Sequence, residues 1–367
     1  MQYDIAAIIW PSYSGDDPRT RIFWPEGYGE WQTVKAMTDK GYAGCRWPRK
    51  PLWGYVNEAD PYVMEMQIRA AVRHKVNVFI YDWYWYDNRP FLENCLHDGF
   101  LGAPNNTDMR FYLMWANHNA TYLWDKRNSY DQSCPVWMGT VTPQVFDEIC
   151  ERTIETYFKK PNYYTIDGCP VYMVFDVDNL IRSFGSVQAC RAGLERFRRK
   201  TAAAGFPGLH LQMAMFGNGT HQPVPSDPPM TEREQLTALG FDSFTNYNWV
   251  CCLDIDRDYA AVEADFQNLC REYSTWEVPY YPNLTVGWDN NVRFHQFVPG
   301  VLRDNTPEKF AAACENVKQY VDAELQKGRL HAPLITVNSW NEWTETSYLE
   351  PDDLYGYGYL EAIRDVF

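Results

Sequence analysis

The sequence predicts an α/β fold, a single (β/α)8 TIM barrel with extended βα loops over residues 1–367. Eight short apolar runs occur along the chain, and most are separated by a segment with helical periodicity, which is typical of a parallel sheet. Eight such units favour a closed barrel over an open doubly wound sheet. No G-x-G-x-x-G motif follows the first run, which weakens the dinucleotide-binding alternative.

The first half of the chain contains four predicted strands. Residues 4–10 form the first, which Pro11 ends, and a long polar and aromatic loop follows over residues 12–49. Asp60 as a cap and Pro61 in the first turn predict a helix over 61–74. Apolar and β-branched runs predict strands over 76–83, 110–115 and 170–175, with a helix over 143–158 before the last of them.

The second half repeats the alternation of helix and strand. A turn-rich loop over 217–230 interrupts it and is followed by a short helix. The remaining predicted elements are a helix over 187–204, strands over 209–216 and 241–247, a helix over 259–273, a strand over 278–285, a helix over 307–327 and a strand over 333–340.

Composition narrows the class of partner. Hydrophobic residues make up 46% of the chain and charged residues 22%, which supplies a large core and excludes wholesale disorder. A formal net charge of −15 argues against nucleic acid and anionic membrane surfaces as partners. Aromatic residues reach 16%, with 15 Trp, which suits a cleft that stacks against sugar rings. We therefore expect a carbohydrate partner.

Cysteine and targeting signals are weak. The ten Cys are scattered without a CxxC pair or zinc-like spacing, so we expect reduced, mostly buried thiols, including the adjacent Cys251 and Cys252. No apolar stretch is long enough for a membrane span. The first predicted strand starts near Met1, so we expect either a cytoplasmic protein or an export signal removed upstream. We expect a monomer that needs no cofactor and no metal.

Polar and aromatic residues gather where the predicted strands end. Catalytic residues of such barrels come from the carboxyl ends of the strands and the loops that follow. Trp supplies a flat apolar face, and Asn and Asp supply groups that bind hydroxyls, so the pattern predicts polyol recognition. The predicted substrate-binding residues are Trp10, Glu30, Trp31, Tyr81, Asp82, Trp83, Trp85, Trp115, Asn117, His118, Asn119, Asp176, Trp288, Asp289, Trp340, Asn341, Trp343, Tyr348 and Glu350.

The clearest motif follows the last predicted strand, where residues 340–352 read W-N-E-W-T-E-T-S-Y-L-E-P-D. Glu342 and Glu345 are three residues apart and can point into one cleft if the segment makes a helical turn. Hydrolysis of a glycosidic bond needs two carboxyl groups with different tasks. Neighbouring Trp side chains lower the local polarity and keep one carboxyl protonated. We predict Glu342 and Glu345 as the catalytic pair.

These residues resemble the N-E-W-x-E-G-x-x-x-E-P motif of the family 99 endo-mannosidases and the WbsX-like proteins related to them. Five further segments, in the expected order, resemble WbsX-like motifs. They are G-Y-G-E-W at 27–31, D-P-Y-V-M-E-M-Q at 60–67, Y-D-W-Y-W at 81–85 with W-A-N-H-N at 115–119, and G-W-D-N-N-V-R at 287–293. The resemblance covers most of the chain.

The resemblance implies a (β/α)8 barrel that acts on glycans. It implies that Glu342 acts as a base on the 2-hydroxyl of the sugar, that Glu345 is the acid/base at the leaving oxygen, and that the reaction retains configuration through an anhydro-sugar. Three positions depart from the family pattern: Thr346 replaces Gly, His118 replaces Glu and Ala120 replaces Trp. These departures concern sugar specificity more than the chemistry.

Two other functions remain open. The WbsX-like group also carries a glycosyltransferase label, which would require an activated donor, although the sequence lacks a P-loop or Gly-rich phosphate cradle. The third hypothesis is a sugar-binding module without catalytic activity, and the Glu pair argues against it. For Asp82, Asp176 and Asp289, a Ca²⁺ or Mg²⁺ site is the alternative to hydroxyl binding, and we prefer hydroxyl binding.

Overall fold

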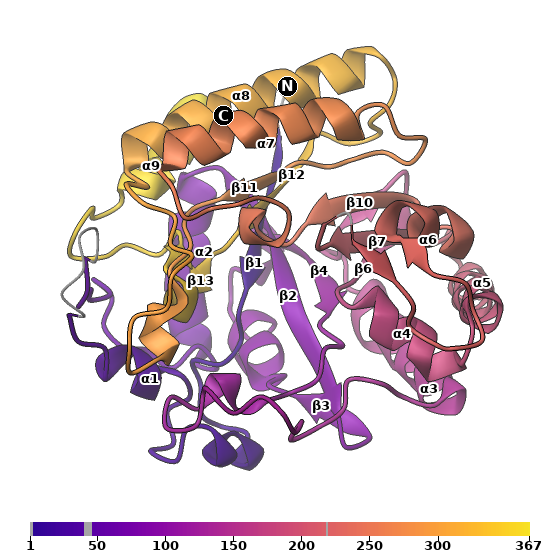
Figure 1. The fold of residues 1–367 in the computed structure, drawn as a ribbon, viewed down its shortest axis with the longest axis horizontal. Helices are drawn as coiled ribbons and strands as arrows, with labels where there is room; N and C mark the ends of the chain where they lie inside the picture. The colour runs from indigo at the N-terminus through magenta and orange to yellow at the C-terminus, as the bar shows by residue number, and fades with distance from the viewer. Residues whose placement is uncertain (1–2, 40–45, 218) are drawn as a thin grey trace.

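The computed structural model describes residues 3–39, 46–217 and 219–367. Its main sheet contains eight parallel strands in the order β10-β7-β6-β4-β2-β1-β12-β11. The sheet closes where Phe244 N donates to Pro279 O at 3.0 Å and Tyr281 N donates to Phe244 O at 2.9 Å. The predicted barrel is therefore confirmed (Figure 1). The strands are β1 Asp4–Ile9, β2 Val76–Tyr86, β4 Arg110–Trp115, β6 Cys169–Val174, β7 His210–Met215, β10 Ser243–Asn246, β11 Asn283–Thr285 and β12 Leu334–Asn338.

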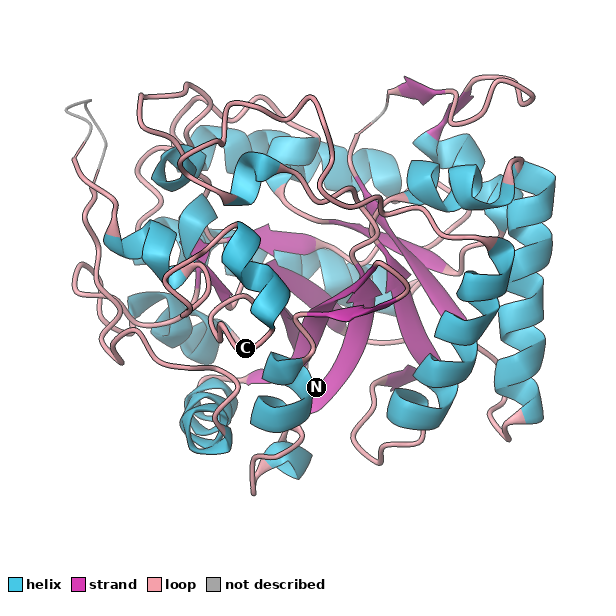
Figure 2. Cartoon of the chain, turned by 90° about the horizontal axis from the view of Figure 1, so that it is seen from below, coloured by secondary structure: helices cyan, strands magenta, loops and turns pink. Residues whose placement is uncertain are grey.

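Helices surround these strands (Figure 2). Pro occupies the first turn of α2, α3 and α8, where its missing N–H costs no hydrogen bond. The α-helices are α1 Trp31–Lys35, α2 Pro61–Arg73, α3 Pro143–Thr153, α4 Val177–Phe184, α5 Val187–Ala203, α6 Glu232–Leu239, α7 Tyr259–Tyr273, α8 Pro307–Gln326 and α9 Gly358–Val366.

Shorter elements lie in the connecting loops. The small strands are β3 Arg89–Phe91, β5 Thr165–Ile166, β8 Thr220–His221, β9 Met230–Thr231, β13 Asn341–Glu342 and β14 Ser347–Tyr348. The short 3-10 and π turns are η1 Pro18–Ile22, η2 Cys95–Phe100, η3 Asn106–Asp108, η4 Tyr122–Trp124, η5 Ile154–Phe158, η6 Trp249–Cys251, η7 Asn290–Arg293 and η8 Trp343–Glu345.

Most predicted elements occur close to their expected bounds, and β4 and α7 match residue for residue. The helix predicted over 143–158 is α3 followed by the π turn η5. The strand predicted over 278–285 is shorter, because Pro279 and Pro282 have no N–H to donate to a ladder. The sequence did not predict α1, α4, α9 or η2, of which α1 has five residues and α4 has eight.

The barrel interior holds a hydrogen-bonded polar layer. The hydroxyls of Thr245 and Thr336 share a hydrogen bond of 2.7 Å across the barrel, and Asn283 Nδ2 donates to Thr336 Oγ1 at 3.2 Å. Tyr112 OH donates to Gln212 Oε1 at 3.1 Å. Each of these buried polar groups has a partner, which limits the cost of placing it in the core.

A second, aromatic core lies among the loops at the carboxyl ends of the strands, and we call it the mouth cluster. Its largest members are Trp10, Trp24, Trp31, Trp47, Trp124 and Trp343. At the other end of the chain α9 packs on α8, and the rings of Tyr3 and Phe367 lie 5.2 Å apart. No helix among the described residues is long and apolar enough to cross a membrane.

The first loop depends on one glycine. Gly29 has a φ of +62°, and a Cβ there would lie 1.7 Å from the carbonyl oxygen of Ser12. The same turn brings Glu30 N to Ser12 O at 3.2 Å. Gly54 also has a positive φ, +80°, but has open space around it. Alanine at Gly54 would therefore introduce backbone strain alone, whereas alanine at Gly29 would introduce the same strain and a steric clash.

We expect Gly54→Ala to lower the free energy of unfolding by about 1–2 kcal/mol, the cost of a left-handed non-glycine residue. Gly29→Ala carries the same cost plus about 1–3 kcal/mol for moving the Ser12 backbone. Urea unfolding of both variants measures the difference. Equal losses in the two variants would show that the loop backbone yields freely and does not hold Glu30 in place.

Candidate active site

The site is organised around the buried side chain of Arg293, which η7 places after β11. Its Nη1 donates to Glu345 Oε1 at 2.9 Å and its Nη2 donates to Glu342 Oε1 at 3.0 Å. Its Nε donates to Glu30 Oε1 at 3.4 Å. One guanidinium thus binds carboxylates from the loops after β1 and β12, and its planar fork fixes their relative positions.

A short turn after β12 presents the two motif carboxyl groups. Residues 341–348 form the small antiparallel pair β13–β14, and η8 lies between the strands. Glu342 N donates to Ser339 Oγ at 2.7 Å, and Thr344 Oγ1 donates to Glu342 Oε1 at 2.9 Å. This turn provides the helical geometry that the sequence analysis required, and both side chains meet on Arg293.

Thr346 ends this turn in the left-handed region, with a φ of 56°. Glycine adopts that conformation without cost, which gives a physical reason for Gly at this position in the resembling motif. Here Thr346 Oγ1 donates to Asp289 O at 2.8 Å and accepts from Trp47 Nε1 at 3.1 Å. These two hydrogen bonds offset part of the backbone strain.

Burial raises the pKa of every carboxyl group on Arg293. For Glu342 burial and the charge of Glu345 raise the pKa well above the ordinary Glu range, and Arg293 opposes them. Burial raises the pKa of Glu345 and of Glu30 as well, again against Arg293. The charge of Glu345 contributes to the raised pKa of Glu342, so the two carboxyl groups disfavour being charged at the same time.

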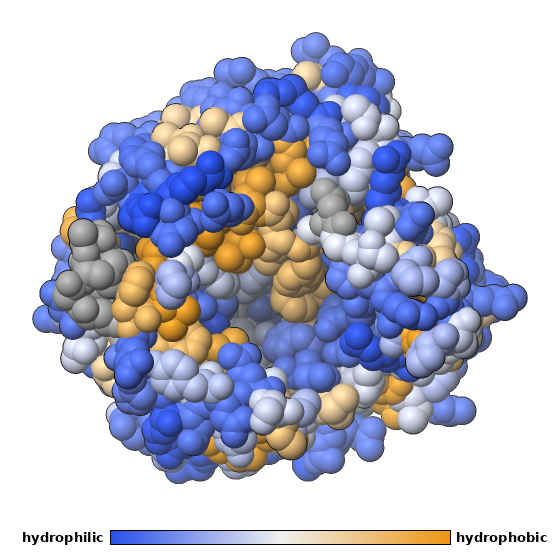
Figure 3. Space-filling view, viewed as in Figure 1, coloured by the Kyte–Doolittle hydropathy of each residue, from blue (hydrophilic) through white to orange (hydrophobic). Residues whose placement is uncertain are grey.

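Two buried carboxyl oxygens at the site have no hydrogen-bond partner in the described part of the chain: Glu345 Oε2 and Asp82 Oδ1. Asp82 lies on β2, and burial and the charge of Glu345 raise its pKa well above the ordinary Asp range. Unpaired buried oxygens are costly, so a ligand group that reaches them gains a hydrogen bond. The space-filling view shows a hollow near the centre of the molecule (Figure 3).

The predicted aromatic residues are mostly buried, and several donate hydrogen bonds within the protein. Trp10 Nε1 donates to Glu30, Trp31 Nε1 to Val56 O, and Trp83 Nε1 to Glu93. The rings of Tyr81, Trp115 and Trp340 pack against Phe100, Phe146 and Phe79, respectively, and Trp85 packs on Trp83. These side chains support the walls of the site in the structure. Trp288 is half-buried against the core.

The last motif carboxyl group, Glu350, belongs to a buried network behind the turn of residues 341–348. Gln67 Nε2 donates to Glu350 Oε1 at 2.8 Å and to Glu58 Oε1 at 3.0 Å. Asn341 Nδ2 donates to Glu58 Oε2 at 2.9 Å, and Trp343 Nε1 donates to Glu350 Oε2 at 2.6 Å. The two carboxyl groups also hydrogen-bond each other, so one of them carries a proton.

Two further members of the motif are held by similar contacts. Tyr348 stacks on Trp343 with ring centroids 3.8 Å apart, and its hydroxyl donates to Asp352 Oδ2 at 2.7 Å. Trp340 Nε1 donates to Gln67 Oε1 at 3.0 Å. The motif from Trp340 to Asp352 is therefore joined to α2 by side-chain hydrogen bonds.

The remaining predicted residues lie where β4 and β6 end, and hydrogen bonds between them connect the two strand ends. Asn117 exchanges hydrogen bonds with the backbone of Asp176, and Asn119 Oδ1 accepts from Gly139 N at 2.9 Å. Asp176 caps α4. The ring of His118 lies 5.3 Å from that of Phe175, and burial lowers its pKa.

Asp289 occupies a second loop and caps η7. The three aspartates Asp82, Asp176 and Asp289 do not gather, and no group of three His, Cys, Asp or Glu in the described ranges could hold a metal ion. The nine described cysteines are free thiols.

Four residues of the site are not among those predicted from the sequence: Arg293, Glu58, Tyr247 and Thr344. Arg293 closes the G-W-D-N-N-V-R segment, so a positive charge at the end of that motif was the available signal. Glu58 gave no signal, because it becomes informative only through its neighbours in space, whereas Tyr247 is the aromatic end of the strand predicted over 241–247. Tyr247 lies beside Glu345 and lowers the pKa of that carboxyl group.

Comparison with known families and proteins gives three findings. The family model described as "Glycosyltransferase WbsX" matches residues 7–363. Two curated relatives, both called uncharacterized protein WxcX, come from Xanthomonas campestris pv. campestris strains B100 and ATCC 33913 and are 24% and 23% identical over 95% of this chain. The alignments cover 47% of each relative, so the chain spans about half the length of the curated relatives it matches.

Solved structures with the same fold include a GH99 endo-alpha-mannosidase from Bacteroides thetaiotaomicron, with a TM-score of 0.57, 14% identity, and coverage of 98% of this chain and 95% of that one. The same enzyme with bis-tris-propane gives a TM-score of 0.59, 16% identity, and coverage of 99% and 95%. A "glycoside hydrolase-like protein" gives a TM-score of 0.59, 12% identity, and coverage of 100% of this chain and 94% of that one. At these identities the likeness shows the fold.

We expect Arg293→Met to lower the free energy of unfolding by about 3–5 kcal/mol at pH 8, because it leaves buried carboxylates without their cation. Without Arg293, burial keeps the carboxyl groups of the folded variant protonated at pH values above the ordinary Glu pKa, where the unfolded chain has released its protons. The stability of the variant therefore falls as the pH rises. The loss at pH 5 should therefore be smaller. Urea unfolding at both pH values measures this.

The matched control is Arg303→Met, because Arg303 forms a surface ion pair with Asp256 in which both side chains are 41% exposed. We expect that variant to lose less than about 1 kcal/mol at either pH. A pH-independent loss in Arg293→Met would contradict the role of Arg293 as the cation of the carboxyl cluster.

A second prediction concerns Glu58, whose pKa burial raises from 4.5 to about 7. The folded chain keeps a proton there that the unfolded chain releases, so this contribution to stability is complete below pH 4.5 and is lost as the pH rises through 7. Glu58→Gln is neutral at every pH. We expect its Tm relative to wild type to rise between pH 4.5 and 7.5, whereas the surface variant Glu361→Gln should show a constant difference.

Proposed function

The chain belongs to the WbsX family, and on that premise we propose that it is a retaining glycoside hydrolase that cleaves a polysaccharide or glycan. The observation that carries the proposal is the attachment of Glu342 and Glu345 to the two Nη atoms of Arg293. Glycoside hydrolysis requires two carboxyl groups held apart in fixed positions and different protonation states. Burial favours the neutral form of one, and Arg293 favours the charged form of the other.

In the proposed reaction Glu345 is the acid. Its Oε1 is bound by Arg293, and its Oε2 is buried without a partner in the described structure, so Oε2 is the atom that carries the proton to the leaving oxygen. Glu342 Oε1 receives hydrogen bonds from both Arg293 and Thr344, which favour its carboxylate form as the base. Burial raises the pKa of Glu345, which favours the proton that the acid has to carry.

The two steps follow the mechanism that the resemblance implies. Glu342 removes the proton of the 2-hydroxyl, whose oxygen bonds to the anomeric carbon as the leaving oxygen departs with the proton of Glu345. Water then opens the anhydro-sugar: Glu345 takes a proton from the water, and Glu342 returns its proton to the 2-oxygen. Two inversions at the anomeric carbon give net retention.

The family description favours a second candidate, a glycosyltransferase. Electrostatics argue against it, since Arg293 is the cation at the centre and Glu30, Glu342 and Glu345 already bind it. Asp82 adds a further buried carboxyl group beside Glu345. A donor phosphate would enter a region where buried carboxyl groups outnumber the cation that could bind it. Product release from polysaccharide alone supports the hydrolase, and a strict requirement for a nucleotide sugar supports the transferase.

We expect Glu345→Gln and Glu342→Gln each to lower kcat about 10²–10⁴-fold while the Tm stays close to that of wild type. The assay is release of reducing ends from mannose-, rhamnose- and galactose-containing polysaccharides. If Glu345 is the acid, Glu345→Gln should lose less activity on an aryl glycoside with a good leaving group, because that bond needs no proton. Glu361→Gln on the surface is the control, and full activity in either site variant would refute the assignment.

A further inference from the structure

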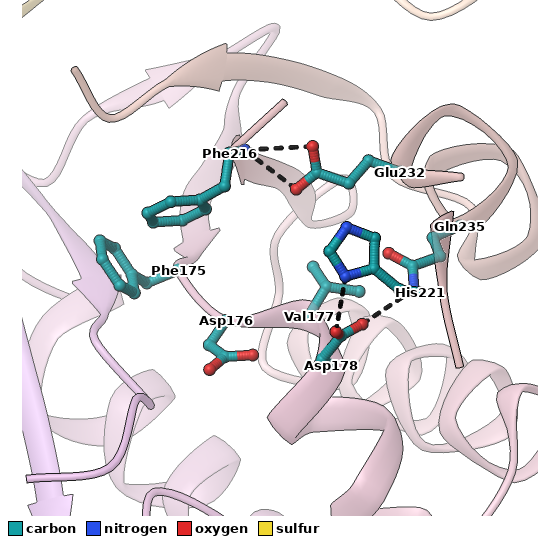
Figure 4. Close-up of a pocket in the computed structure, with 8 residues that line it drawn as sticks. All are labelled: Phe175, Asp176, Val177, Asp178, Phe216, His221, Glu232 and Gln235. Carbon is teal, nitrogen blue, oxygen red and sulfur yellow. Dashed lines mark hydrogen bonds and ion pairs between the residues drawn. The ribbon is translucent and has the colours of Figure 1, made fainter. Parts of the chain in front are cut away.

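A cavity of about 220 Å³ lies next to the Arg293 site, at the carboxyl ends of β6 and β7 (Figure 4). Phe175 follows β6 and Phe216 follows β7, and both rings line the cavity. Tyr247, which follows β10, has its ring centroid 5.1 Å from Phe175 and 6.3 Å from Phe216. Tyr247 also borders Glu345, so one aromatic layer separates the cavity from the catalytic pair.

The wall opposite the Phe rings is polar and fixed in orientation (Figure 4). His221 Nδ1 and Gln235 Nε2 lie 2.9 Å from the two different oxygens of Asp178. A carboxylate only accepts hydrogen bonds, so Nδ1 carries a hydrogen and the bond to Asp178 fixes the orientation of the ring. Within the described ranges Nε2 makes no hydrogen bond to the protein, which leaves it available to a ligand hydroxyl.

The cavity is built by a loop that is secured at several points. His221 lies on β8, which pairs with β9 in the connection between β7 and α6. Glu232, at the start of α6, accepts hydrogen bonds from Phe216 N at 2.9 and 3.2 Å. Asp227 Oδ2 accepts from Val187 N at 2.6 Å, and Arg182 Nε donates to Pro223 O at 3.2 Å. These bonds hold the polar wall at a set distance from the rings.

We propose that this cavity is a second sugar-binding subsite that takes one uncharged pyranose ring of the glycan, an inference that rests on the proposed function. Two phenyl rings offer an apolar surface to the C–H face of a sugar, and the imidazole, amide and carboxyl groups offer partners to its hydroxyls. Its volume is below the ~300–1,000 Å³ of sites for larger ligands, which suits one ring.

Charge sets the specificity of this subsite. Asp176, Asp178 and Glu232 line the cavity, and the His221 ring donates to Asp178. A uronic acid or a phosphorylated sugar would place an anion among carboxyl groups, which costs free energy and excludes it. The glycan then runs from the catalytic pair past Tyr247 into the cavity, and the sugar in the cavity has to be uncharged.

The test reads the cavity directly by NMR of protein labelled at histidine with ¹³C and ¹⁵N. The His221 ring signal is assigned by its loss in His221→Ala, and the probes are methyl α-D-mannopyranoside, methyl α-L-rhamnopyranoside, methyl α-D-galactopyranoside and D-glucuronate. At least one neutral glycoside should shift the His221 signal saturably, and glucuronate should not. His331, a surface residue paired with Asp167, is the internal control and should not move.

Phe216→Ala removes one ring and leaves Asp178 and Gln235 to orient His221. We expect it to weaken the saturable shift about tenfold. The proposal is overturned if none of the neutral glycosides shifts His221, if glucuronate binds as well as they do, or if Phe216→Ala binds with wild-type affinity. Because no catalysis is needed, a saturable His221 shift in a protein that releases no sugar would refute the proposed function and keep the subsite. Hydrolysis without a shift of the His221 signal would support the proposed function and overturn the subsite.

Discussion

The structure of the site depends on one interaction, the binding of three buried carboxyl groups by Arg293. Glu30 comes from the loop after β1, Arg293 from the loop after β11, and Glu342 and Glu345 from the turn after β12. The charges could not be buried separately, because an isolated buried ion loses its hydration without compensation. Ionic attraction to a single guanidinium therefore brings the ends of neighbouring strands β1, β12 and β11 to a common centre.

The surroundings of these carboxyl groups offset part of the free energy that their burial costs. The mouth cluster packs Trp rings around the loops, and their indole N–H groups satisfy carboxyl oxygens, as Trp10 does for Glu30 and Trp343 does for Glu350. Behind the turn, Glu58 and Glu350 share a proton and the donor Gln67 Nε2 of α2, and Asn341 of the motif donates to Glu58 alone. The same aromatic shell that excludes water also raises the pKa of the carboxyl groups, which is the condition that acid catalysis requires.

The proposed hydrolase and the proposed subsite are consistent with one distribution of charge. Carboxyl groups outnumber cations both at Arg293 and in the cavity beside Phe175 and Phe216, so both regions favour neutral polyols and disfavour phosphates. The aromatic layer of Phe175, Phe216 and Tyr247 joins the two regions. A glycan that lies along this layer would bring one sugar ring to Glu345 and another to His221.

The sequence by itself determined the barrel, because eight apolar runs alternating with helical periodicity have few other ways to bury their apolar surface. It also determined the catalytic turn as a candidate, since two Glu three residues apart beside Trp residues are a local pattern. It missed α4 and α9, which are short, and overestimated the β11 strand, where two Pro residues remove ladder donors.

Only the tertiary structure decided which aromatic residues support the site and which polar residues meet in space. Trp115 and Trp340 look like sugar-stacking residues in the sequence, yet their rings pack against Phe146 and Phe79. Alternate residues of a strand point to opposite sides of the barrel wall, and composition does not reveal that side. Arg293, Glu58 and His221 gain their roles from partners far away in the chain. Such pairings are fixed by the closure of the barrel, so the local sequence alone does not encode them.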